Sequence, residues 1–175
     1  MSSHKLDESA NGVYIISATP FTENGEVDMD SADRLVDFYI EKGVSGITIL
    51  GMMGEAQKMA PQESENFLDR IMKRIGSKVP VIVGVSNAGL DNLVHLSKTS
   101  MDKGAAGVMV APLADLRTEE KVYNYFSQVF AALGDDIPVC YQDYPLATGT
   151  EISVTLFNRL VADFDKLVML KHEEC

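Results

Sequence analysis

Cysteine and basic residues are scarce in this chain, and each scarcity excludes a class of protein. Of 175 residues only two are cysteine, Cys140 inside an expected strand and Cys175 at the last position. They form neither a disulfide framework nor a pair spaced to bind a metal, so a reducing, cytoplasmic environment is expected. Lysine and arginine number 15 against 26 aspartate and glutamate residues, a net charge of −11. We therefore expect neither nucleic acid nor an anionic membrane surface as a partner, because both bind basic patches.

Long apolar runs are missing as well. No segment approaches the roughly 20 apolar residues that a membrane-spanning helix needs, and residues 1–11 lack the apolar core of a signal peptide. We expect no membrane association. The hydrophobic content of 46% and the charged content of 23% are typical of an ordinary globular protein. The chain is therefore interpreted as an N-terminal tail over 1–11 followed by one domain over 12–175.

Short apolar runs alternate with amphipathic segments throughout this domain. The expected strands are 13–18, 46–50, 80–85, 107–111, 138–142 and 167–170. The expected helices begin near Asp30 or Ser31, Pro61, Leu90, Thr118 and Ser153. Strands that are apolar almost throughout, each followed by an amphipathic helix, indicate a parallel sheet covered by helices. Six strands suffice for an open doubly wound sheet, whereas a (β/α)₈ barrel needs eight, so the pattern alone favours the open sheet.

The last expected strand ends in a lysine. Residues 167–170 are all apolar, and Lys171 follows them directly. A lysine that emerges from a buried strand is partly desolvated, which disfavours the charged ammonium and favours the nucleophilic free amine. On this strand alone, a lysine that reaches out to water is the more common explanation. His172 and Glu173 adjoin the lysine and are candidates for acid–base steps, although strand alternation turns His172 away from it.

Other unusual residues gather where the remaining strands end. Thr19-Pro20-Phe21 follows the first strand, Gly51-Met52-Met53-Gly54-Glu55 the second, and a Pro-x-x-Thr-Gly motif starting at Pro145 the fifth. No single motif is specific. Their order and spacing from residue 13 to Lys171, however, resemble the dihydrodipicolinate synthase and N-acetylneuraminate lyase family, the pyruvate-type class I aldolases.

The resemblance implies an α/β fold, a (β/α)₈ TIM barrel whose active site lies at the carboxyl ends of the strands. Because such a barrel runs to roughly 250 residues, only about its first six strands are present in this chain. We expect the chain to be truncated or to be part of a longer one. We also expect an isolated chain of this length to have little or no lyase activity. Relatives usually form tetramers or dimers, so a homo-oligomer is expected.

The resemblance also implies a chemistry. Lys171 would attack the ketone of pyruvate or a related 2-keto acid and lose water to form a Schiff base, which accepts electrons when a neighbouring bond breaks. The loop containing Gly51, Met52, Met53 and Gly54 would bind the keto-acid carboxylate through backbone N–H groups. A plain strand-to-helix turn is the alternative for this loop. Thr19 is a further expected substrate-binding residue. No metal is needed, and no cofactor is expected.

One departure from the family pattern concerns the catalytic tyrosine. The family places it three residues before the proline of the fifth motif. Counting back from Pro145 without a gap reaches Gln142, and allowing one extra residue reaches Tyr141. Neighbouring strand residues point to opposite faces, so the two alignments are not equivalent. We favour Gln142 in the pocket and Tyr141 toward the helices, and both stay candidates for the catalytic position.

The other departures remove polar groups. Met52 and Met53 replace two hydroxyl-bearing residues, and a thioether cannot relay a proton. Ala147 stands where synthases have an arginine that holds a substrate carboxylate. These losses favour a divergent Schiff-base lyase, either an aldolase or a dehydratase, that acts on pyruvate or a related 2-keto acid. The alternatives are dihydrodipicolinate synthase proper, which condenses pyruvate with aspartate semialdehyde, and a catalytically silent remnant of the family.

Overall fold

The computed structural model describes residues 5–114 and 116–173. Strands and helices alternate along them. The strands are β1 (Tyr14–Ile16), β2 (Gly46–Ile49), β3 (Val81–Gly84), β4 (Gly107–Val110), β5 (Val139–Asp143) and β6 (Leu167–His172). The helices are α1 (Met29–Glu41), the 3-10 helix η1 (Ala56–Lys58), α2 (Pro61–Ile75), α3 (Leu90–Asp102), α4 (Glu119–Leu133), α5 (Pro145–Thr148) and α6 (Val154–Asp163). None of these described helices is both long and apolar enough to cross a membrane.

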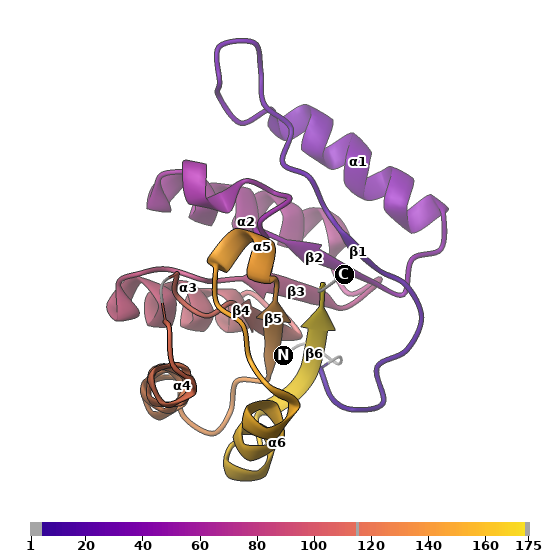
Figure 1. The fold of residues 1–175 in the computed structure, drawn as a ribbon. Coiled ribbons are helices and arrows are strands. Elements are labelled where there is room, and N and C mark those ends of the chain that lie inside the picture. The colour runs from indigo at the N-terminus through magenta and orange to yellow at the C-terminus, as the bar shows by residue number, and fades with distance from the viewer. Residues whose placement is uncertain (1–4, 115, 174–175) are drawn as a thin grey trace.

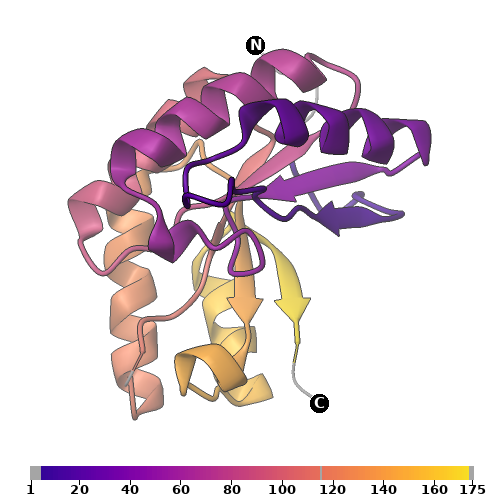
Figure 2. The same cartoon turned by 90° about the horizontal axis from the view of Figure 1, so that it is seen from above.

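The strands form one parallel sheet in the order in which they occur along the chain, from β1 to β6. A doubly wound sheet reverses its strand order at a switch point, and this sheet does not. The preference for an open doubly wound sheet, based on the pattern alone, is therefore wrong. Each new strand is added at the same edge of the sheet, and each crossover has the same hand, so every helix is placed on the same face. The helices α1, α2, α3, α4 and α6 accordingly lie along one side of the curved sheet (Figures 1 and 2). The result is a half-barrel, as the family resemblance implies.

Helix starts follow local capping chemistry. The predicted helix starts near Thr118 and Ser153 are confirmed: both residues are N-caps, and their hydroxyls accept from the N–H groups of Lys121 and Leu156. The start of α1 differs from the prediction, since Asp28 is its N-cap. The Asp28 carboxylate accepts from the Ser31 N–H at 2.9 Å. The short helix α5, which follows β5, was not predicted.

The main core lies between the sheet and these helices. It contains the outward-facing residues of the strands together with the inner faces of the helices, such as Phe67 of α2 and Phe126 of α4. A second, smaller core lies on the opposite, concave face of the sheet. Its buried residues include Ile82, Met109 and Cys140. The strands are therefore apolar on both faces, which explains why they appear as continuous apolar runs in the sequence.

The described part of the N-terminal tail covers the amino-terminal end of the concave face. The Leu6 N–H donates to the Ala106 carbonyl at 2.8 Å, and the Leu6 side chain is only 4% exposed. Leu6 packs in the smaller core and approaches Gly107 closely enough that a Cβ there would lie 3.2 Å from it. The tail thus fills one end of the half-barrel and leaves the carboxyl ends of the strands open.

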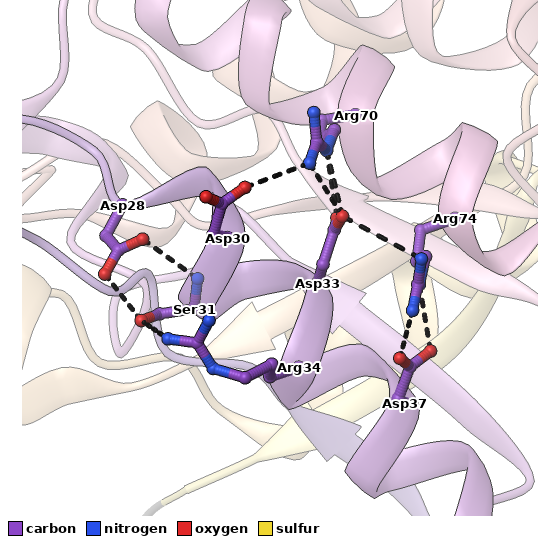
Figure 3. Close-up of polar contacts among 8 residues, drawn as sticks. All are labelled: Asp28, Asp30, Ser31, Asp33, Arg34, Asp37, Arg70 and Arg74. Carbon is purple, nitrogen blue, oxygen red and sulfur yellow. Dashed lines mark hydrogen bonds and ion pairs between the residues drawn. The ribbon is translucent and has the colours of Figure 1, made fainter.

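Ion pairs join the first two helices of the outer layer (Figure 3). The Arg70 guanidinium of α2 contacts Asp33 at 2.8 Å and Asp30 at 3.2 Å, and Arg74 pairs with Asp37. The Arg74 guanidinium holds the pKa of the Asp37 carboxyl below its usual range. Exposed pairs of this kind contribute little to stability. They join the exposed faces of α1 and α2, whose buried faces share the main core.

Candidate active site

Lys171 and Gln142 are direct neighbours across the last two strands. They are partners in the β5–β6 register, so their side chains leave the sheet on the same face. That face is the concave one, because Cys140, two residues before Gln142 on β5, belongs to the concave core. The Lys171 side chain is only 21% exposed. The lysine therefore emerges inside the half-barrel, at the carboxyl end of the sheet.

Glu173 joins these two side chains. Its carboxylate oxygen Oε1 forms an ion pair with Lys171 Nζ and also accepts from Gln142 Nε2 at 2.9 Å. The Glu173 N–H donates to the Asp143 carbonyl at 2.8 Å, which continues the β5–β6 ladder beyond the end of β6. His172, between the two, turns to the other face, where its Nδ1 lies 2.7 Å from Asp143 Oδ2. The alternation expected for His172 is thus confirmed.

Tyr141 lies on the opposite face from the lysine. It is fully buried, and its ring stacks on Phe126 of α4 with centroids 4.7 Å apart. Phe157 of α6 meets the same ring edge-on at 5.9 Å. Burial raises the pKa of the Tyr141 phenol, and its hydroxyl has no hydrogen-bond partner among the described residues. The structure therefore brings Gln142, and not Tyr141, to Lys171.

Strained backbone flanks the Gly51–Gly54 loop. Leu50 and Glu55, on either side of it, have φ values of 53° and 55°, a left-handed conformation that costs a non-glycine residue about 1–2 kcal/mol. The neighbouring strand accommodates this bend because Gly84 has no side chain. A Cβ at Gly84 would lie 2.1 Å from the Leu50 carbonyl oxygen. Strain held in place by its surroundings in this way is typical of binding loops.

The four residues of the loop have different surroundings. Gly51 and Met52 line the space above the sheet, whereas Met53 is 64% exposed at its rim. Gly54 is buried, and a Cβ there would lie 3.3 Å from the Thr19 hydroxyl. Thr19 is itself buried beneath the loop, its hydroxyl without a described partner. Thr19 therefore packs beneath the buried end of the loop at Gly54. Neither residue lines either of the two cavities described next.

Two adjoining cavities open at this end of the half-barrel. The first, of about 370 Å³, is lined by Ile16, Met52, Met53, Gln142, Tyr144, Lys171 and Glu173. The second, of about 260 Å³, is mainly apolar and is lined by Leu50, Gly51, Met52, Ala56, Gln57, Gly84, Ser86, Met109, Gln142 and Ala147. Met52 and Gln142 border both. Lys171 is the one cation among these lining residues.

Residues 9–174 match the model of the Dihydrodipicolinate synthetase family. The chain belongs to this family. Its half-barrel is also similar to a crystal structure of dihydrodipicolinate synthase from Rhodopseudomonas palustris, with a TM-score of 0.94 and 45% identity over 98% of this chain and 57% of that one. The 4-hydroxy-tetrahydrodipicolinate synthase of Laribacter hongkongensis is 32% identical over 91% of this chain and 54% of its own length.

A third similar protein is YagE, a prophage protein of the same family from E. coli K12, whose crystal structure was determined in complex with pyruvate. The TM-score is 0.83 and the identity 25%, over 91% of this chain and 54% of that one. The chain thus spans about half the length of the relatives that it matches.

Sequence reasoning missed part of the cavity wall. Gly84, Ser86 and Met109 line the second cavity from β3, the segment after it, and β4. No motif marks them. The signal that could have found them is the alternation of β4, which places Met109 on the same face as Cys140 through the strand register.

Proposed function

We propose that the protein is a Schiff-base-forming lyase that acts on pyruvate or a related 2-keto acid, with Lys171 as the nucleophile. The observation that carries this proposal is the position of Lys171: its amine lines a cavity at the carboxyl end of a parallel half-barrel, the end at which barrels of this kind carry their chemistry. Gln142, its partner across β5 and β6, lines the same cavity.

The loop after β2 would bind the keto-acid carboxylate. Gly51 borders the second cavity and Met52 borders both, and the strained residue Leu50 aims the loop over the sheet. Backbone N–H groups in such a bend bind an anion without a cationic side chain. The amine would then attack the ketone carbon, and loss of water would leave an iminium that accepts electrons when a bond at the adjacent carbon breaks.

The second cavity would hold the part of the substrate that lies beyond the ketone. Its wall is formed by Met52, Met109 and Ala147, and no charged residue lies among its described lining residues. A distal carboxylate would meet polar groups such as Ser86 and Gln57 there but no cationic side chain, so its desolvation would cost free energy. This supports an aldolase or dehydratase acting on a 2-keto acid with an uncharged distal group. It argues against condensation of pyruvate with aspartate semialdehyde. Binding of pyruvate by YagE supports the keto-acid class.

Three further properties are proposed for the protein. We expect it in the cytoplasm, in keeping with its two cysteines, and as a homo-oligomer, dimer or tetramer.

Among the described residues β1 pairs only with β2 and β6 only with β5, so the concave face is open between these two edges. For that reason we expect the 175-residue chain to form the imine but to turn over slowly. Light scattering and a pyruvate-release assay test the oligomer and the turnover.

Borohydride trapping tests the central proposal. The wild-type chain is incubated with pyruvate or a longer 2-keto acid, the imine is reduced, and the modified peptide is identified by mass spectrometry. We expect a single adduct on Lys171, its loss in Lys171→Met, and its retention in the matched variant Lys166→Met, one residue before the start of the same strand. No adduct with any keto acid, or an adduct on other lysines only, would favour the catalytically silent alternative.

A further inference from the structure

Among the described residues, Glu173 is the one whose carboxylate forms an ion pair with the amine of Lys171. One oxygen, Oε1, is shared between Lys171 Nζ and the Gln142 amide. The Glu173 side chain is only 30% exposed. Its position is fixed on two sides, because its backbone N–H is bonded to the Asp143 carbonyl and its side chain to Gln142. A carboxylate held in this way, beside an amine that must lose and regain protons, is placed for proton transfer.

The other described groups around Glu173 are less suited to this role. Tyr144 lines the same cavity, but no hydrogen bond links it to the lysine or to Glu173 among the interactions of the described residues. Cys140 lies beneath Lys171, and burial raises the pKa of its thiol to about 12, so it stays protonated. The pair of Asp143 and His172 lies on the other face of the sheet.

We propose that Glu173 is the general acid–base residue of Schiff-base formation, a role that rests on the proposed function of Lys171. The Lys171 ammonium transfers a proton to the Glu173 carboxylate, and the free amine attacks the ketone carbon. The N–C bond forms as the C=O π electrons move to oxygen. A second nitrogen proton moves to that oxygen, which gives the neutral carbinolamine. Glu173 then protonates the hydroxyl group, the C–O bond breaks, and water leaves as the nitrogen lone pair forms the iminium.

Proton and charge balance closes in this sequence. The ammonium has three protons; the iminium keeps one and the released water takes two. Glu173 ends as the carboxylate with which it began. The positive charge of the starting ammonium is on nitrogen again in the iminium, whereas nitrogen is neutral in the free amine and in the carbinolamine. Gln142 is a positioning residue in this scheme, because its amide N–H donates to the Glu173 oxygen and holds it toward Lys171. The methionines at 52 and 53 are not required to relay any proton.

The test compares initial rates of borohydride-trapped imine formation with pyruvate in the wild-type chain and in Glu173→Gln. We expect the variant to be slower by about 100-fold, the range in which general acid–base catalysis acts, and to lose the acidic limb of the pH–rate profile. The matched control is Glu120→Gln, which breaks the surface pair with Arg159 on α6 and should keep the wild-type rate and profile. Circular dichroism checks that each variant is folded.

A second variant separates catalysis from structure. Glu173→Ala leaves space for a small carboxylic acid, so added formate should restore part of its rate but should not restore Lys171→Met. A Glu173→Gln chain that traps pyruvate at the wild-type rate and with the wild-type pH profile would overturn the role of Glu173 and leave the proposed function intact. Absence of any adduct in the wild-type chain would instead overturn the proposed function, and this inference with it.

Discussion

Tyr141 and Gln142 are consecutive residues of β5 whose side chains lie on opposite faces of the sheet. The ring of Tyr141 stacks on Phe126 of α4, whereas the amide of Gln142 donates a hydrogen bond to Glu173 beside Lys171. The strand alternates with a period of two residues, so both side chains cannot reach the same site. The residue next to the proposed nucleophile is therefore an amide, and the buried phenol belongs to the packing of the outer layer.

This relationship predicts different effects for the two substitutions on imine trapping. Tyr141→Phe should keep the wild-type trapping rate, because its hydroxyl is remote from the lysine. Gln142→Leu should slow trapping roughly tenfold, since a hydrogen bond to a charged group contributes about 1.5 kcal/mol or more. Rates are measured by borohydride quenching with pyruvate. A slow Tyr141→Phe beside a normal Gln142→Leu would show that the tyrosine, not the glutamine, acts at the site.

Stability provides an independent check on Tyr141. Its buried hydroxyl has no partner among the described residues, so Tyr141→Phe should change the free energy of unfolding by less than about 1 kcal/mol. Tyr141→Ala should lower it by about 3–5 kcal/mol, because the ring packs against Phe126 and Phe157. Urea unfolding followed by circular dichroism measures both. An equally large loss in Tyr141→Phe would mean that the hydroxyl is bonded.

Gly84 is predicted to be essential for the shape of the loop after β2. A methyl group there would clash with the Leu50 carbonyl at 2.1 Å, so Gly84→Ala must displace the loop or strand β3. We expect a loss of about 1–3 kcal/mol in the free energy of unfolding, the usual cost of overpacking, and weaker trapping of pyruvate. The matched control is Gly89→Ala, where the nearest atoms belong to flexible asparagine side chains. Equal stability of the two variants would argue against the close approach.

The N-terminal tail is predicted to stabilise the half-barrel through one side chain. Leu6 is buried against the concave core, so Leu6→Ala should lower the free energy of unfolding by about 2–5 kcal/mol. Lys5→Ala, at the exposed neighbouring position, should have little effect. Thermal unfolding of the two variants measures the difference. A tail that does not contact the sheet would make the two substitutions equivalent.

Buried protonated groups predict a loss of stability at alkaline pH. Burial raises the pKa of Cys140 from 9.0 to about 12 and that of Tyr125 from 10.0 to about 12. A group whose pKa is raised in the folded state stabilises it fully below the unfolded value, and this contribution is lost as the pH rises toward the folded value. Stability should thus fall from about pH 9 through Cys140 and from about pH 10 through Tyr125, up to about pH 12, by up to about 1.4 kcal/mol per pH unit for each group.

A variant without the thiol isolates one of these groups. Cys140→Ala should flatten the pH dependence of the free energy of unfolding between pH 9 and 10, where Cys140 begins to contribute before Tyr125 does. Urea unfolding at a series of pH values measures the slope. A slope that is unchanged in Cys140→Ala would show that the thiol titrates normally and is accessible to water.

Much of the fold could be predicted because its signals are local. Six apolar runs, the caps Thr118 and Ser153, and the glycines after the helices place the elements within a few residues. Which side of the sheet the helices cover is not a local property. Parallel strands with alternating helices have the same periodicity in a doubly wound sheet and in a barrel, so the pattern alone favoured the wrong architecture, and only the motif order corrected it.

By itself, the sequence determined the strands, the family-like motifs at their ends, the position of Lys171, and the two-residue alternation that separates Tyr141 from Gln142. Only the tertiary structure decided that Thr19 lies beneath the loop, that Gly84 and Met109 line the cavity, and that Glu173 contacts the amine. These relationships join segments that are distant along the chain, or a residue beyond the end of a strand. Their geometry depends on register and sheet curvature, which no local pattern contains.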